Sequence, residues 1–234
     1  MNDFNDIMAE LKKVNNKIQV YIPSQNKDVE FSPITLSQQK LIIDKVMTSN
    51  FGIIDLFNGL YNVIKTSTTF NTDNLNTIDR INIILAFRKH IAPVYQDVPL
   101  DKLLEKNRTL SLPPLTKTFT TDKFTFELHA PNLTIDYKYN NYIITTYKDE
   151  KQIVGKMLVN EICKFIKQIT INESNQVMEL ESLAIKNKFT VIESLNMNAL
   201  PEVMDYINVI RDTEVLLTKF EDKQIEIGPE VFML

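Results

Sequence analysis

The sequence predicts an α+β fold that is mainly helical, with small antiparallel β-hairpins and a short antiparallel sheet in the middle of the chain. Apolar residues recur at helical spacing over most of the 234 residues. Residues 117–147 interrupt that pattern with alternating β-branched and aromatic side chains, which are typical of strands. Helical and strand patterns come in blocks along the chain, whereas they alternate in parallel-sheet folds.

The opening of the chain predicts a hairpin and a capped helix. Residues 17–22 and 28–34 carry apolar side chains in alternation on either side of a polar turn. Thr35 then precedes an amphipathic segment, and Gln38 follows three residues later. At this spacing a hydroxyl and an amide can satisfy each other's free backbone N–H groups. We therefore predict a helix over residues 36–47.

Two further helices and a domain boundary are predicted next. Apolar residues recur at helical spacing over residues 53–64 and 78–91, and Pro93 ends the second helix. Ile83 and Phe87 make that helix apolar nearly all round, so we expect it at the centre of its domain. Residues 92–116 contain four prolines around a short helical segment, 101–107. We place the boundary there, between domains 1–110 and 115–234.

The second half predicts strands, then helices, then a hairpin. We expect three short antiparallel strands within residues 117–147, followed by a long amphipathic helix over 153–169. Two more helices are indicated near 185–195 and 200–210, with Ser182 and Asn198 as possible caps. A last hairpin turns at residues 221–223, and an apolar tail, 231–234, ends the sequence.

Reactive side chains are scarce, and we predict no catalytic, cofactor-binding or metal-binding residue. The single cysteine, Cys163, has no disulfide partner within the chain and lies beside an apolar helix stripe, as a buried small hydrophobe would. His90 is expected at a helix C-terminus and His129 in a loop, each in a different element from Cys163. The four glycines form neither a nucleophile elbow nor a phosphate-binding loop. We therefore expect a protein that is not an enzyme.

Acidic residues leave one enzymatic alternative open. Glu179 and Glu181 fall in a predicted loop, and Asp149 and Glu150 fall at the start of a predicted helix, where solvated or capping roles suffice. A hydrolase would need a polar pocket that joins groups such as His129 and Glu127.

Charge and hydropathy disfavour nucleic acids and membranes as partners. The net charge is −4, and neither half of the chain has a basic excess large enough for a duplex-binding surface. No apolar run reaches the roughly 18 residues that span a bilayer, so the expected compartment is the cytoplasm. Aromatic and lysine side chains within 117–147 leave open a single-strand nucleic-acid binder. One buried sheet face explains the same alternation, and we favour that interpretation.

Scattered patches of the sequence carry a family resemblance. In the opening they are Ile22, Pro23, Ser24, Phe31, Pro33 and Lys40; near the end they are Ile192, Ser194, Leu195, Val203, Tyr206, Ile207 and Phe232. Together they resemble the baseplate hub and hub-assembly proteins of T-even-type contractile-tailed phages. The resemblance implies a tail-assembly protein of the virion baseplate, or of the host cytoplasm during assembly. Its partners would be spike, tube-initiating or tape-measure proteins. A transient chaperone of the tape-measure protein or of hub subunits is the alternative.

The resemblance does not carry over a metal. Many members of that family have a Cys-x-x-Cys pair in the final hairpin, which suggests a zinc-bound turn, and this sequence has no cysteine there. Two segments are candidate partner contacts. One is the polar hairpin tip with Ser24, Gln25 and Asn26. The other is the apolar end with Phe232, Met233 and Leu234, which could equally cover the core.

Overall fold

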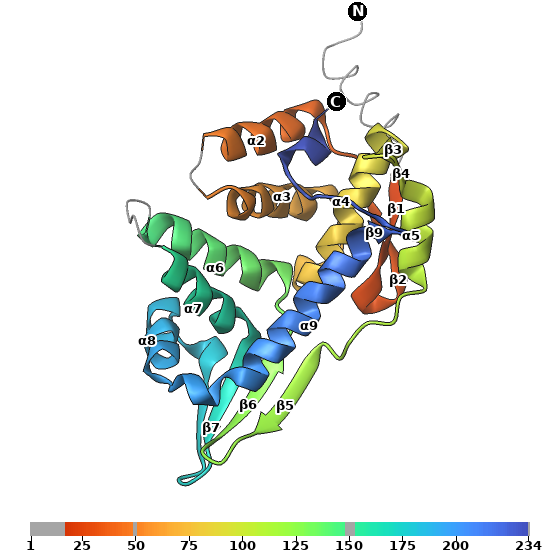
Figure 1. Cartoon of the computed structure of the whole chain (residues 1–234). Helices are drawn as coiled ribbons and strands as arrows, with labels where there is room; N and C mark the ends of the chain where they lie inside the picture. The colour runs from red at the N-terminus through yellow and green to blue at the C-terminus, as the bar shows by residue number, and fades with distance from the viewer. Residues whose placement is uncertain (1–16, 49–50, 148–152, 234) are drawn as a thin grey trace, which may run out of the picture.

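The fold is α+β, as the sequence predicts. A computed structural model describes residues 17–48, 51–147 and 153–233. Figure 1 shows helices α2 (Leu36–Met47) and α3 (Ile53–Ser67) at one end of the molecule and a four-stranded sheet at the other. Helix α9 (Pro201–Thr218) runs diagonally between the two ends and packs against α4 (Thr77–Ile91) and α7 (Val154–Phe165).

The opening hairpin and its helix are confirmed. Strands β1 (Ile18–Ile22) and β2 (Lys27–Phe31) pair antiparallel across a 3-10 turn. The Gln38 backbone N–H donates to Thr35 Oγ1 at 3.2 Å, and the Thr35 N–H donates to Gln38 Oε1 at 2.9 Å. This reciprocal capping fixes the start of α2 because it satisfies two backbone donors that the first helical turn leaves free.

Helix α4 lies at the centre of the N-terminal half, as its all-round apolar pattern predicts. Every residue from Thr77 to Arg88 is buried, since β1, α5 (Leu100–Arg108), α6 (Leu133–Thr146) and α9 all pack around it. A small unpredicted ladder, β3 (Val94–Tyr95) with β4 (Val98–Pro99), connects α4 to α5.

The sheet differs from the prediction at its third strand. Its order is β5 (Thr116–Thr120), β6 (Phe124–His129), β7 (Ile166–Ile171), β8 (Gln176–Glu179), and every neighbouring pair is antiparallel. The strand expected over residues 133–147 is wrong, because that segment forms α6, with the Asn132 side chain accepting the Ile135 N–H at 2.8 Å. The buried face of α6 includes Asp136 and Asn140. Because these core positions are polar, the spacing of apolar residues alone does not reveal the helical repeat of α6.

The long helix predicted over 153–169 is also wrong at its C-terminal end. Helix α7 stops at Phe165, and the chain continues directly as β7. Ile166 pairs with Leu128 and Gln168 with Glu127, so the β6–β7 ladder skips one residue in between. This bulge places Ile166 and Ile169 in the same buried layer at a spacing of three, which imitates a helix.

The predicted caps of the last two helices are not caps. Ser182 and Asn198 lie in short 3-10 turns, Leu180–Ser182 and Met197–Ala199, while α8 (Ile185–Ser194) and α9 begin after Ala184 and Leu200. Helix α9 also extends further than predicted, to Thr218. The final hairpin therefore keeps its predicted turn but shrinks to β9 (Lys219–Phe220) and β10 (Lys223–Gln224).

Both halves of the chain contribute to one continuous cluster of buried apolar side chains. The predicted domain boundary falls on an extended segment, residues 110–115, that forms no helix or strand. The division into domains 1–110 and 115–234 stays a prediction.

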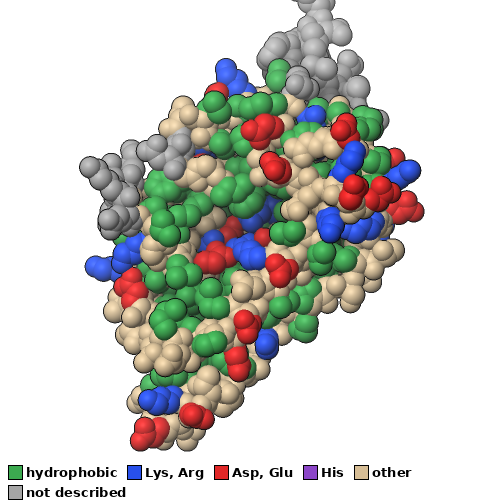
Figure 2. Space-filling view, viewed as in Figure 1, with side chains coloured by type: hydrophobic (Ala, Val, Ile, Leu, Met, Phe, Trp, Pro, Cys, Tyr) green, Lys and Arg blue, Asp and Glu red, His purple; other side chains and the backbone are tan. Residues whose placement is uncertain are grey.

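A network of alternating charges, buried at Arg80, Asp136 and Lys164 and half-buried at its other end, links the two halves. It runs through Arg80, Asp136, Lys164, Glu161, Arg211 and Glu214, on helices α4, α6, α7 and α9. Asp136 Oδ2 accepts from Arg80 at 2.5 Å and Oδ1 accepts from Lys164 at 2.8 Å. These two cations hold the pKa of Asp136 well below its usual range despite complete burial. Three cations balance three anions. Figure 2 shows charged side chains of both signs gathered in a hollow in the middle of this face.

Candidate interaction surfaces

The hairpin tip is only partly the exposed surface that the sequence predicts. Gln25 and Asn26 are exposed, but Ser24 is half-buried, and that part of the prediction is wrong. The Ser24 N–H and Oγ–H both donate to the carboxylate of Asp79, at 2.8 and 2.6 Å. Burial raises the pKa of Asp79 to about 6, although these hydrogen bonds and one from the Asn76 N–H favour its charged form. Ser24 therefore attaches the hairpin to the start of α4.

The apolar C-terminal segment covers the core. Val231 and Phe232 have no exposed surface, so of the two roles that the sequence leaves open for this segment, Phe232 covers the core. Met233 remains 36% exposed, and Leu234 lies outside the described residues. Phe232 is inside because it fills the space between α2 and α4, against which the last 3-10 turn packs.

Two polar side chains hold this segment in place. Arg88 of α4 donates to the carbonyl oxygens of Val231 and Met233, and Gln39 of α2 donates to that of Phe232. Among residues 231–233, which the structure describes, Met233 is the one that still faces outward. It borders an open apolar groove of about 360 Å³ on α2, whose other walls include Leu36 and Ile43.

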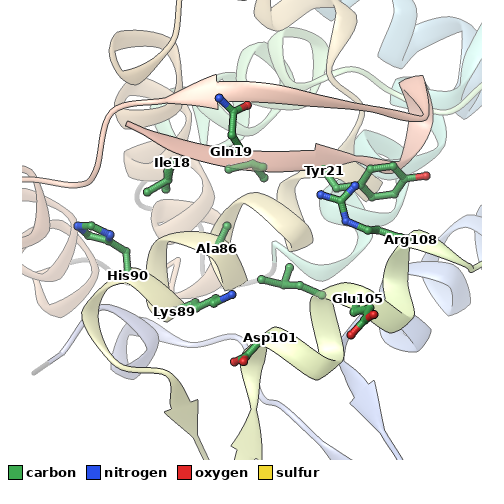
Figure 3. A pocket seen from close by; sticks show the side chains of 11 residues that line it. Ile18, Gln19, Tyr21, Ala86, Lys89, His90, Asp101, Glu105 and Arg108 are labelled. Atoms are coloured by element: carbon green, nitrogen blue, oxygen red, sulfur yellow. The ribbon is translucent and has the colours of Figure 1, made fainter. Parts of the chain in front are cut away.

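A second groove lies along β1. Four successive β1 residues line it, and α4 and α5 form its other walls, around a volume of about 660 Å³. Figure 3 shows side chains of both signs at its opening, including Lys89, Asp101 and Glu105. Arg108 closes one end, with its guanidinium 4.8 Å from the Tyr21 ring centroid and bonded to Asp28 of β2.

A strand edge forms one wall of this groove. Among the described residues β2 is the strand that pairs with β1, and the opposite edge of β1 faces α4 and α5. One group on that edge already has a partner, since Asn82 donates to the Tyr21 carbonyl oxygen at 3.2 Å. An open strand edge beside mixed charges suits an extended polypeptide segment, which can add main-chain hydrogen bonds.

His129 lines a polar pocket of about 540 Å³. The sequence predicts this residue in a loop, but it is the last residue of β6. Its Nε2 lies 2.9 Å from the Lys164 carbonyl oxygen and its Nδ1 lies 3.3 Å from Glu181 Oε1. Burial lowers the pKa of His129 despite Glu181. A neutral imidazole has one N–H, yet both ring nitrogens face acceptors. Through these two contacts His129 connects the end of β6 with α7 and with the 3-10 turn Leu180–Ser182.

The two residues of the hydrolase alternative do not share this pocket. Glu127 accepts a hydrogen bond from Gln168 at 3.4 Å on the sheet and is not among the residues that line the pocket. Sequence reasoning missed Glu181 as the neighbour of His129, because no local pattern indicates that a 3-10 turn lies beside the end of β6.

Lys188 is a buried cation in the wall of the same pocket. It is 2% exposed and lies 5.3 Å from the Tyr139 ring centroid. Burial lowers its pKa from 10.5 to about 8, because the charged amine is poorly solvated. The nearby thiol of Cys163 offers no counter-charge, since burial raises its pKa to about 12. Cys163 is fully buried, as the sequence predicts.

We expect Lys188→Met to stabilise the protein by about 1–3 kcal/mol at pH 7, because the charged amine loses solvation on folding. The folded chain binds fewer protons than the unfolded chain between about pH 8 and 10.5. Wild-type stability therefore rises with pH through that window, and the advantage of the variant shrinks by pH 10. Chemical denaturation at pH 7 and pH 10 measures both effects. Lys186→Met, at an exposed position on α8, is the control, and an equal gain from both variants would contradict the burial argument.

The remaining candidates lie apart. His90 is exposed in the last turn of α4, as predicted. Across residues 17–48, 51–147 and 153–233, no group of three or more His, Cys, Asp or Glu side chains is placed to hold a metal ion. Glu179 ends β8 and Glu181 lies in the following turn, while Asp149 and Glu150 fall outside the described residues.

The aromatic side chains of the sheet do not form a base-stacking surface. Phe119 and Phe126 are buried and stack on each other with ring centroids 5.0 Å apart. Tyr137 and Tyr139, expected on a third strand, belong to α6. The buried-face interpretation of the alternation therefore fits Phe119 and Phe126, whereas Phe124 of β6 is half-buried.

Comparisons with protein-family models, with curated proteins and with solved structures find no match to this chain. In the part of the chain that the structure describes, no helix combines the length and the apolar character needed to cross a bilayer.

Proposed function

We propose that the chain is a phage tail-assembly protein that acts by protein–protein contact, as a component or an assembly factor of the baseplate hub. The resemblance in sequence supports this proposal and supplies the candidate partners, which are tape-measure, spike and tube-initiating proteins. Most residues that carry the resemblance are buried, among them Phe31, Val203, Tyr206 and Phe232. The resemblance thus concerns positions that specify a fold.

The groove along β1 is the structural observation that favours contact with a polypeptide. A strand edge, aromatic surface and charges of both signs meet there, and these groups can bind an extended segment through its main chain and side chains together. Mass spectrometry of purified tails tests the proposal, with the lysate of the same infection as reference. A hub component is expected in finished tails at a fixed ratio to other hub proteins.

Transient chaperoning is the second candidate, and the same strand edge favours it. Main-chain hydrogen bonds tolerate many sequences, so an open edge can hold a partly folded client. A chaperone is expected in infected cells but not in finished tails, and its co-expression should keep a tape-measure or hub protein soluble. Normal baseplate assembly by phage that lack the gene would contradict both candidates.

A further inference from the structure

Helix α2 carries a stripe of four residues at helical spacing, of which Leu36, Lys40 and Met47 are exposed and Ile43 is half-buried. Leu36 and Met47 are 73% and 70% exposed, and Lys40 and Ile43 lie between them on the same side. The spacing of four, three and four residues matches the seam along which paired helices pack. The side of α2 next to the stripe is already occupied, since Ile42 is fully buried and α2 packs on α3 and on the C-terminal turn. The stripe is therefore a surface on which α2 could pack against one more helix.

The stripe is symmetric about its own centre. Because the spacing reads the same in both directions, an antiparallel copy of α2 places Leu36 against Met47 and Lys40 against Ile43, twice. Asp44 lies next to Ile43, so each Lys40 ammonium would also reach the Asp44 of the other helix. A parallel copy would instead place Lys40 near Lys40 and Asp44 near Asp44. Like charges that face each other across an interface repel, so the charge pattern favours the antiparallel arrangement.

The two charges have no partner of their own. In the part of the chain that the structure describes, the side chains of Lys40 and Asp44 form no ion pair or hydrogen bond, and the Asp44 backbone carbonyl oxygen accepts from Thr48 Oγ1 at 2.8 Å. Both side chains line the open groove that Met233 borders. Leu36, Ile43 and Met233 supply apolar surface in the same groove. An isologous interface requires a surface that is complementary to its own two-fold image.

We infer that the α2 stripe is a homodimer interface, formed by two antiparallel α2 helices related by a two-fold axis. A helix of 12 residues is about 18 Å long, so the contact lies at the small end of specific interfaces. We therefore expect a weak dimer. The inference concerns self-association and does not depend on the proposed function.

Sedimentation velocity of the full chain, over a concentration series that reaches the high micromolar range, tests the dimer. Lys40→Glu alone and Asp44→Lys alone each create two like-charge contacts across the axis, and each is expected to weaken dimerisation about tenfold or more. An equimolar mixture of the two variants should dimerise again, because both cross-axis contacts become attractive in the heterodimer. Lys117→Glu, an exposed site on β5 with the same change of charge, should leave dimerisation unchanged.

Failure of the mixture to dimerise would overturn the antiparallel arrangement. A wild-type chain that is monomeric at every concentration would overturn the dimer. The helix that packs on the stripe would then belong to another protein. Neither result depends on the composition of finished tails, so this inference and the proposed function can fail separately.

Discussion

Replacing Asp136 with asparagine is expected to destabilise the folded chain by about 3–5 kcal/mol, because it leaves the buried Arg80 without its anion and Lys164 with Glu161 alone. Arg80 and Lys164 both bond this carboxylate, and their side chains are 4% and 5% exposed. An asparagine would also turn an NH₂ group toward one of these donors. Urea denaturation at pH 7, followed by circular dichroism, measures the loss.

The pH dependence of the Asp136→Asn variant separates charge from packing. The folded pKa of Asp136 is depressed, so its contribution to stability is present above the unfolded value and is lost as the pH falls below about 4. The difference between wild type and variant should shrink over that range. Asp205→Asn, at an exposed position on α9, is the matched control and should change stability by less than about 0.5 kcal/mol. Equal losses in the two variants would show that the network contributes nothing.

Replacing Phe232 with alanine is expected to cost about 3–5 kcal/mol, the usual range for removing a fully buried aromatic side chain. The loss is large because the C-terminal turn packs on α2 and α4, and the cavity would open between them. Thermal denaturation measures the loss.

The matched control for this variant is Met233→Ala in the same segment. Met233 is partly exposed, so its truncation should cost less than about 1 kcal/mol. The comparison also decides between the two roles that the sequence leaves open for the tail. A Phe232→Ala protein of unchanged stability that failed to assemble into tails would return Phe232 to a docking role and contradict its place in the core.

The sequence was sufficient where the determining interactions are local. Thr35 and Gln38 bond each other's backbone within one turn, so the start of α2 can be predicted from four consecutive residues. The opening hairpin depends on alternation along two adjacent strands, and the centrality of α4 depends on its own apolar composition. In each case the residues that decide the structure are also neighbours in sequence.

The candidate surfaces were predictable only in part. Gln25 and Asn26 are exposed as polar turn residues usually are, whereas Ser24 is held by Asp79, 55 positions away. The groove along β1 brings together residues from β1, α4 and α5 that no pattern connects. The α2 stripe is visible in the sequence as a helical face, but only the packed structure shows that this face is left open.

By itself the sequence determined the α+β class, the opening hairpin and its capped helix, the buried place of Cys163 and the expectation of a protein built for contacts. Tertiary structure decided that residues 133–146 are a helix, that β7 follows α7 without a break, and that Phe232 is inside. The physical reason is the same in each case. Asp136 can face the core only because Arg80 and Lys164 meet it there, Ile166 and Ile169 share one layer only because β6 pairs with β7 through a bulge, and Phe232 is buried only because α2 and α4 close over it.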